Sequence, residues 1–169
     1  MTAQLQMLVG DITKLQVDAI VNAANAQLAG GGGVDGAIHN AAGWEQLQKA
    51  CRKLGGCPTG QVKVTPGFNL PARYILHAVG PVWQGGNHNE PQLLANCYSN
   101  ALRLCREMKL ESVAFPAISC GVYGYPAELA VQVAVDTVRD ALIGSDIAVT
   151  FCCFDQAMAE LYRNYLSAR

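Results

Sequence analysis

Two polar side chains follow a run of glycines and could act together. Asp35 and His39 come directly after Gly30–Gly33 and lie four residues apart, so they would share one face of a helix. A carboxylate beside such a run could orient or deprotonate a water. It could also simply complement the helix dipole, and His39 could be a hydrogen-bonded core histidine. An acidic residue beside an anion site costs electrostatic energy, which argues against a purely structural role for Asp35.

The glycine run itself has the features of an anion cradle. Glycine lets the backbone approach a ligand closely, and the N-terminus of the following helix offers unpaired N–H groups. The alternative is a flexible turn. Gly31, Gly33 and Gly36 also fit the dinucleotide-binding pattern GxGxxG. However, the preceding strand is expected to end at Asn22, and no acidic residue closes the next strand, so this pattern does not indicate a dinucleotide-binding fold.

A second glycine-bearing loop follows one expected strand and precedes one expected helix. Two such loops could clamp a diphosphate from opposite sides, although an ordinary strand–helix connection would have the same sequence features. Cys120 could be a nucleophile near a helix N-terminus, where a thiolate is favoured, but the sequence places no histidine to act as its base. The loop consists of Ser119, Cys120, Gly121, Val122, Tyr123 and Gly124.

Other candidates stand at or near the ends of expected strands. The amides of Asn22 and Asn25 could bond a ribose or position a water, although asparagine is also common in turns. Asp11 could accept from an adenine amino group or form an Asx-turn. Phe154 could stack on a base or pack in the core. His77 lies inside an apolar strand, which predicts a buried, hydrogen-bonded histidine.

The elements that must position these side chains alternate between strand and helix. This order predicts an α/β sandwich with helices on both faces of a sheet. The strands expected at 61–65 and 74–79 have no helix between them, which indicates a mixed sheet. Ligands of open α/β sheets bind outside the carboxyl ends of the strands. We expect strands at 5–10, 19–22, 61–65, 74–79, 112–115 and 147–154, and helices at 34–51, 92–106, 126–142 and from 156, with Asp155 as N-cap and Pro126 in a first turn.

Length and composition limit what the chain can be. Its 169 residues are 51% apolar with 17 Gly and 7 Pro, which suits a single domain over 1–169 and excludes a disordered or collagen-like chain. No apolar run could span a bilayer and no signal peptide is evident, so we expect a cytoplasmic protein. The net charge of −1 argues against a broad nucleic-acid surface. Seven cysteines without CxxC spacing and three scattered histidines indicate reduced thiols and no zinc site.

In their order along the chain, these segments resemble the macrodomain family. The likeness is greatest to its MacroD-type branch and to the bacterial enzymes described as O-acetyl-ADP-ribose deacetylases, and it runs from Val9 to about Tyr165. Two positions depart from the family pattern, because threonine is more common at Cys120 and arginine at Asn40. Cys120 should still permit backbone phosphate contacts, although it could make the loop oxidisable. The matching segments are GDIT at 10–13, VDAIVNAAN at 17–25, GGGGVDGAIHNAAG at 30–43, CPTG at 57–60, HAVGPVW at 77–83 and SVAFPAISCGVYGYP at 112–126.

The resemblance implies a fold, a ligand and roles for particular residues. The fold would be a three-layer α/β/α sandwich with a six-stranded mixed sheet, and the ligand would be ADP-ribose. Asp35 would be the catalytic carboxylate, and Asn25 would help it to place a water at the distal ribose. The substrate-binding residues would be Asp11, Ile12, Asn22, Asn25, Gly32, Gly33, Val34, Asp35, Ser119, Cys120, Gly121, Val122, Tyr123 and Phe154, with His39 in support.

We therefore expect a hydrolase that deacetylates O-acetyl-ADP-ribose, removes mono-ADP-ribose esterified to acidic protein residues, or does both. The attacking water would be held by Asp35 and Asn25. No metal or redox cofactor is implied, and the partners would be ADP-ribose derivatives and ADP-ribosylated proteins, with a monomer as the expected state. One alternative is a non-catalytic module that reads ADP-ribose, against which the presence of Asp35 argues. A regulatory module that binds protein or RNA is a third interpretation, with no positive support in the sequence.

Overall fold

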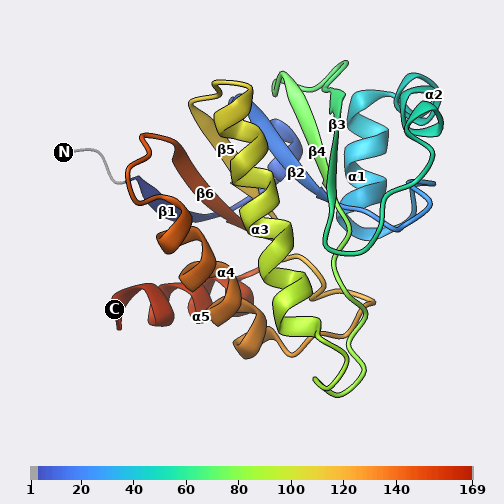
Figure 1. Cartoon of the computed structure of the whole chain (residues 1–169). Helices are drawn as coiled ribbons and strands as arrows, with labels where there is room; N and C mark the ends of the chain where they lie inside the picture. The colour runs from blue at the N-terminus through green and yellow to red at the C-terminus, as the bar shows by residue number, and fades with distance from the viewer. Residues whose placement is uncertain (1–3, 169) are drawn as a thin grey trace.

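One mixed sheet organises the part of the chain that the computed structural model describes, residues 4–168. Its strand order is β1-β6-β5-β2-β4-β3 (Figure 1). β3 pairs antiparallel with β4, and every other neighbouring pair is parallel, as the missing helix between these two segments predicts. The strands are β1 (Leu5–Val9), β2 (Ala19–Ala23), β3 (Val62–Pro66), β4 (Tyr74–Ala78), β5 (Ser112–Phe115) and β6 (Ala148–Cys153).

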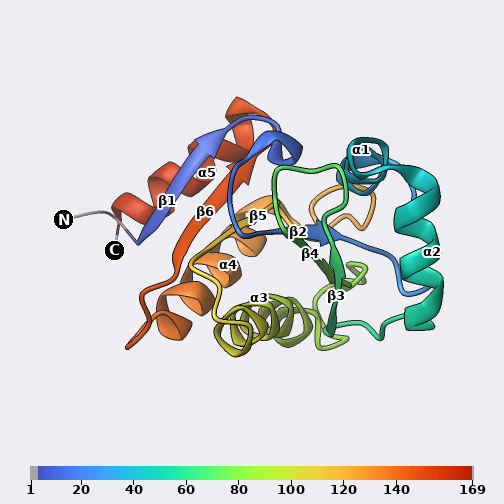
Figure 2. The same cartoon turned by 90° about the horizontal axis from the view of Figure 1, so that it is seen from above.

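Helices cover both faces of the sheet, so the predicted three-layer α/β/α sandwich is confirmed. One apolar core joins the sheet to α3, α4 and α5, and a second joins it to α1 and α2. Figure 2 shows α3 and α1 on opposite sides of strands β2 and β4. The helices are α1 (Gly33–Ala42), α2 (Trp44–Leu54), α3 (Glu90–Glu107), α4 (Ala127–Ala141) and α5 (Gln156–Ser167), and a 3-10 turn, η1, spans Ile12–Lys14.

The central strands are apolar on both faces because both faces are buried. On β5, Val113 and Phe115 contribute to the core under α3 and α4, whereas Ala114 belongs to the core under α1 and α2. Phe151 on β6 stacks on Tyr162 of α5 with ring centroids 4.7 Å apart. Full burial of one such large side chain contributes about 1.5–3 kcal/mol. The nearly continuous apolar runs are therefore what hold the two helical layers to the sheet.

The single helix expected over residues 34–51 is wrong, because the structure has two helices there. Gly43 separates α1 from α2 with φ 107° and ψ 109°, a conformation that favours glycine. The apolar periodicity continues across this break and gives no sign of it. A smaller difference concerns Pro126, which is the N-cap of α4 and not part of its first turn. The Asp155 N-cap is confirmed, since its side chain accepts from Met158 N at 2.9 Å.

The parallel strands bring several predicted site residues to one edge of the sheet. β1, β2, β5 and β6 run in the same direction, so the segments after their carboxyl ends share that edge. Asp11 follows β1, Asn25 follows β2, Ser119 follows β5 and Phe154 follows β6. Within residues 4–168 no helix is both long and apolar enough to cross a membrane.

Candidate functional site

The segment between β2 and α1 is held by one asparagine. Asn25 Nδ2 donates to Gly30 O at 2.9 Å, and Asn25 Oδ1 accepts from Ala29 N at 2.9 Å. Both ends of the Asn25 amide are therefore used to close the turn that carries the glycine run. Gly30 lies at φ 79°, in the left-handed region, and a Cβ there would meet the ring of Trp44 at 2.6 Å.

Residues 30–35, which we call the first amide loop, present backbone N–H groups without acceptors. Gly32 is the N-cap of α1, and no side chain in the described part of the chain, residues 4–168, caps this helix. Among residues 4–168, nothing accepts from the N–H groups of Gly33, Val34 and Asp35. The first N–H groups of a helix point along its axis and carry partial positive charge, so this terminus can bind an anion. The predicted phosphate cradle therefore has the donors that it needs.

A buried carboxyl lies beside these donors. Asp35 is only 5% exposed, and its Oδ1 accepts from Asn22 Nδ2 at 2.8 Å and lies 3.0 Å from His39 Nδ1. Its other oxygen faces the loop, because a Cβ built on Gly31 would lie 3.8 Å from Asp35 Oδ2 and 4.0 Å from Asn25 Nδ2. The two predicted catalytic side chains thus approach the same glycine from different elements.

His39 supports Asp35 from inside the protein. The ring is 1% exposed, and its Nδ1 also lies 3.0 Å from Asp35 O. Burial alone would lower the pKa of His39, but hydrogen bonds to Asp35 outweigh it and raise the pKa to about 10. The side-chain amide of Gln48 faces Nε2 at 2.7 Å, and the Trp44 ring lies 4.4 Å away. His39 is therefore a core histidine whose partner is the candidate catalytic carboxylate.

Residues 119–123, the second amide loop, present three more free donors. Among residues 4–168, nothing accepts from the N–H groups of Gly121, Val122 and Tyr123, and Val122 is fully exposed. Ser119 adopts φ 68°, and its Oγ donates to Pro81 O at 2.8 Å. The loop therefore has free backbone donors of the kind that the predicted anion site requires.

Cys120 has neither the exposure nor the ionisation of a nucleophile. Its thiol is partly buried, and burial raises its pKa to about 11. The N–H of Cys120 donates to Ala117 O at 3.3 Å, so this amide is used inside the protein. The structure does not favour the nucleophile interpretation, and it leaves anion binding to the three amides that follow.

A neighbouring segment supports the second amide loop. Trp83 N donates to Tyr123 O at 2.8 Å, and the Trp83 ring lies 4.7 Å from that of Tyr125. Glu90 accepts from Gln84 N, Gly86 N and His88 N at 2.7, 3.0 and 2.6 Å. Burial would raise the pKa of Glu90, but these three donors lower it to about 2. Sequence reasoning missed Glu90, whose position at the start of a helix before a proline was its only signal.

Asp11, Ile12 and Phe154, the residues predicted to lie near the adenine, differ in how exposed they are. Asp11 Oδ1 accepts from Thr13 N at 3.0 Å and from Thr13 Oγ1 at 2.6 Å, so Asp11 forms the Asx-turn given above as its alternative role. These hydrogen bonds lower the pKa of the Asp11 carboxyl. Its carboxyl remains on an exposed residue, whereas Ile12 is buried. Phe154 is 94% exposed, so the core-packing alternative is wrong and its ring face is free.

Asn22 and His77 lie behind the site. Asn22 is 0% exposed, which places its amide against Asp35 and away from any ligand. His77 is 1% exposed and bonded on both ring nitrogens, to Asn22 Nδ2 at 3.1 Å and to Thr65 Oγ1 at 2.9 Å. Its prediction as a buried, hydrogen-bonded histidine is confirmed. Burial lowers the pKa of His77 to about 4, so the ring is neutral at neutral pH.

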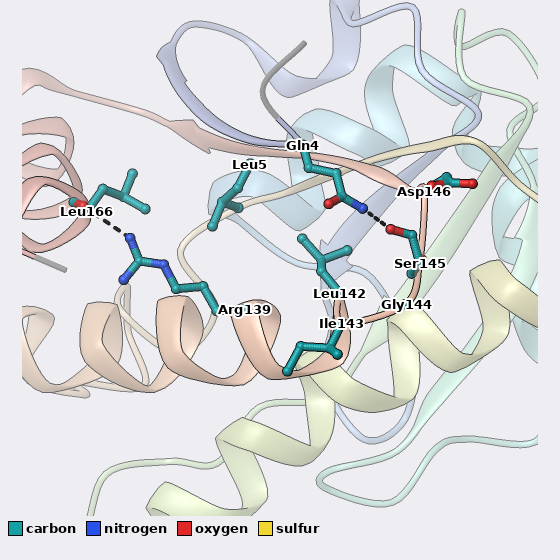
Figure 3. A pocket seen from close by; sticks show the side chains of 9 residues that line it. All are labelled: Gln4, Leu5, Arg139, Leu142, Ile143, Gly144, Ser145, Asp146 and Leu166. Atoms are coloured by element: carbon teal, nitrogen blue, oxygen red, sulfur yellow. Dashed lines mark hydrogen bonds between the residues drawn. The ribbon is translucent and has the colours of Figure 1, made fainter. Parts of the chain in front are cut away.

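A hollow of about 880 Å³ lies elsewhere, at the amino ends of β1 and β6 (Figure 3). Arg139 donates to Leu166 O at 3.0 Å on its rim, and the Gln4 amide donates to Ser145 O. No residue predicted for the site lines it. Within residues 4–168, no group of three or more His, Cys, Asp or Glu side chains could hold a metal ion.

The geometry brings together uncharged donors of the kind that can bind an anion. Two loops offer backbone N–H groups, a carboxylate lies at the first of them, and an exposed aromatic ring follows a neighbouring strand. Such a site can bind a small phosphorylated ligand without lysine or arginine, because helix N-termini and backbone amides supply the positive potential. A buried carboxylate with one free oxygen can accept a proton from a water held beside that ligand.

Comparisons with known proteins agree with this description. The Macro domain family model matches residues 21–134. A macro domain-containing protein of Chlorobaculum tepidum is 55% identical over 94% of this chain and 92% of its own length, and an O-acetyl-ADP-ribose deacetylase of Escherichia fergusonii is 50% identical over 99% and 97%. The Oceanobacillus iheyensis macrodomain with ADP superimposes with a TM-score of 0.92 at 45% identity, covering 96% of this chain and 89% of that one. The Trypanosoma brucei macrodomain in complex with ADP-ribose gives 0.89 at 41%, covering 96% and 69%.

Proposed function

Because this chain belongs to the macro domain family, we propose that it binds ADP-ribose and hydrolyses esters at its distal ribose. The diphosphate lies between the two amide loops and accepts from their backbone N–H groups. Support comes from the free donors of both loops and from the solved relatives that hold ADP or ADP-ribose. The adenine stacks on the exposed ring of Phe154, and its amino group donates to Asp11.

The uncharged cradle explains how a chain of net charge −1 can take a diphosphate. The donors are N–H groups whose partial charges are fixed by the backbone. They lie in loops whose glycines let backbone segments approach closely. At Gly36, for example, an added Cβ would lie only 2.5 Å from Gly31 O. A lysine would add positive charge, but it would not supply several backbone donors at closely approaching glycines.

The reaction uses a water beside Asp35. The observation that carries this step is the approach of Asp35 Oδ2 and Asn25 Nδ2 to the same glycine, Gly31. A water held there attacks the ester carbonyl of O-acetyl-ADP-ribose while Asp35 takes one of its protons. The bond between the acyl carbon and the ribose oxygen then breaks, and Asp35 returns the proton to that oxygen, which gives acetate and ADP-ribose. An ADP-ribose ester of a protein carboxylate has the same bond, so ADP-ribosylated proteins are a second substrate class. General-base help of this kind contributes about 10²- to 10⁴-fold.

The alternative is a module that binds ADP-ribose and leaves it intact. One observation favours it: Asn25 uses both ends of its amide to hold the loop backbone. In a pure binding module, Asp35 and Asn25 would serve only to shape the first amide loop.

Acetate release and ligand binding separate the two. We expect Asp35→Ala and Asp35→Asn to lower kcat for O-acetyl-ADP-ribose about 10²- to 10⁴-fold, with the Kd for ADP-ribose changed only a few-fold. Calorimetry gives the Kd, and a melting temperature shows that each variant is folded. Asp146→Asn, at an exposed carboxylate by the distant hollow, is the matched control. Wild-type protein that binds ADP-ribose and releases no acetate would be a reader, and unchanged turnover in both Asp35 variants would remove Asp35 from the chemistry.

A further inference from the structure

Four buried polar side chains form a chain behind the first amide loop. Thr65 on β3, His77 on β4, Asn22 on β2 and Asp35 on α1 are 3%, 1%, 0% and 5% exposed. The contacts are 2.9 Å from Thr65 Oγ1 to His77 Nε2, 3.1 Å from His77 Nδ1 to Asn22 Nδ2, and 2.8 Å from Asn22 Nδ2 to Asp35 Oδ1. Asn22 and His77 are also register partners across β2 and β4. The contacts thus run from the edge strand β3 through β4 and β2 to the candidate carboxylate.

The hydrogen atoms of this chain can be assigned from its ends. Thr65 Oγ1 donates to Pro66 O at 3.1 Å, so its lone pair is left to accept from His77 Nε2–H. A neutral His77 with its proton on Nε2 has a lone pair on Nδ1, which accepts from Asn22 Nδ2. The second hydrogen of the Asn22 amide then goes to Asp35 Oδ1.

The opposite orientation of the Asn22 amide is unfavourable. It would place Oδ1 of Asn22 against the Asp35 carboxylate and against the His77 lone pair, with acceptors facing acceptors. In the observed orientation, Asn22 Oδ1 is buried without a partner among residues 4–168. The observed orientation costs less free energy than the opposite one. It leaves one acceptor, Asn22 Oδ1, unsatisfied, but it satisfies both hydrogens of the NH₂ group and one oxygen of the Asp35 carboxylate.

The consequence is a difference between the two oxygens of Asp35. Oδ1 receives the Asn22 amide and faces His39 Nδ1, whereas Oδ2 is the oxygen near Gly31. We infer that Thr65 and His77 are positioning residues, which fix the direction of the Asn22 amide and so determine that Asp35 Oδ2 faces the water. This inference rests on the proposed function, because it gives the water-activating oxygen its orientation.

Thr65→Val is the direct test, because valine keeps the shape and removes the acceptor for His77 Nε2–H. We expect kcat for O-acetyl-ADP-ribose to fall by up to about 100-fold, with the Kd for ADP-ribose within about two-fold of wild type. Thr65→Ser restores the hydroxyl and should restore most of kcat. The matched control is Thr150→Val, at a threonine on β6 that is 6% exposed and outside the chain of contacts. Wild-type kcat in Thr65→Val, or an equal loss in Thr150→Val, would overturn the inference.

A second measurement does not depend on activity. Two-bond ¹H–¹⁵N correlations of the imidazole should show His77 as the neutral Nε2–H tautomer at pH 7, and Thr65→Val should change the tautomer population. A ring protonated on Nδ1 in wild type contradicts the inference whatever the enzyme does. Wild-type protein with the Nε2–H tautomer but no acetate release would instead refute the proposed hydrolysis and leave the positioning of Asp35 intact.

Discussion

The two amide loops offer the same kind of donor but are supported in different ways. The first rests on buried side chains, with Asp35 bonded into a chain that reaches His77. The second rests on a neighbouring segment of backbone: Trp83 N donates to Tyr123 O, and Glu90 gathers three N–H groups of that segment. The first support includes a carboxylate, Asp35, within the loop that it holds, whereas Glu90 bonds the segment that contacts the second loop.

Under the proposed function, this difference separates the anchoring of the ligand from the chemistry on it. Free backbone N–H groups can be positioned by either kind of support, so both loops can hold phosphate oxygens. In the first support the carboxylate, Asp35, has an oxygen facing the loop, whereas in the second support the carboxylate of Glu90 is used to bind three backbone N–H groups. Changes to the first support should therefore alter turnover, and changes to the second should alter affinity.

The two supports should also titrate in different pH ranges. His77, with a pKa lowered to about 4, is neutral in the folded protein while the unfolded chain protonates near 6.5, so stability falls as pH drops from about 6.5 to 4. This corresponds to about 3 kcal/mol of unfolding free energy. Asp35 and His39 face His77 and act in opposite directions on its pKa. Lys63 on β3 is the register partner of His77, and its amine donates to Leu54 O and Gly56 O.

Glu90, in the other support, has its pKa lowered to about 2, so its contribution persists at pH 4.5 and disappears as pH falls through about 2. Urea unfolding between pH 7 and 4 measures the contrast. His77→Gln should remove the loss of stability in this range. His88→Gln, at the exposed histidine of the second support, should leave it in place. Equal pH profiles for the two variants would contradict the comparison.

Gly36→Ala tests the geometry of the first amide loop. Its Cβ would lie 2.5 Å from Gly31 O, and backbone must move to accommodate it. A shift of about 1 Å at a reacting centre can cost about 100-fold in rate, so we expect kcat/KM to fall by about that factor, with kcat itself reduced. Steady-state acetate release measures both constants. A variant that raises KM and keeps kcat would show that this loop only anchors the ligand.

Gly80→Ala is the corresponding change at the second amide loop. Its Cβ would lie 2.2 Å from Ser119 Oγ and 2.6 Å from Ile118 Cγ2, so Ser119 must shift. Overpacking of this kind lowers the free energy of unfolding by about 1–3 kcal/mol. If about 1.4 kcal/mol of strain is relieved by moving the loop out of its binding conformation, the Kd weakens about tenfold. We expect a roughly tenfold weaker Kd for ADP-ribose by calorimetry, with kcat at saturation preserved. Loss of kcat as large as in Gly36→Ala would remove the distinction between the loops.

The smallest effect is expected at Ser119. Ser119→Ala removes the bond to Pro81 O and should lower the unfolding free energy by about 1 kcal/mol. Ser119→Gly also removes the bond but adopts φ 68° without strain, so it should cost less. Denaturant unfolding of the two variants gives the difference. If glycine is no better than alanine here, backbone strain at Ser119 does not contribute to the support of the second loop.

The sequence was most informative where the physical cause is local. The Asp155 cap follows from a side chain and a backbone N–H only three residues apart. Gly43 was missed because the apolar period of α1 continues into α2. Phe154 looked like the last residue of an apolar strand, and the strand ends one residue earlier.

Contacts between distant segments had no signal of this kind. Thr65 and His77 come together only through the pairing of β3 with β4, and Gly80 meets Ser119 across 39 positions of the chain. The order of the glycine run, Asn25 and Asp35 was enough to predict that these residues lie close together. It was not enough to predict which Asp35 oxygen is free, because that depends on side chains from three strands.

The positions of the two tryptophans give each loop its own optical signal. Trp44 lies over Gly30 and 4.4 Å from the His39 ring, and Trp83 contacts Tyr123 and Tyr125. Indole emission depends on the immediate surroundings of the ring. Replacing either tryptophan with phenylalanine would leave a protein whose fluorescence reports on one loop alone, so that the order in which the two loops respond to a ligand becomes measurable by stopped flow without an attached dye.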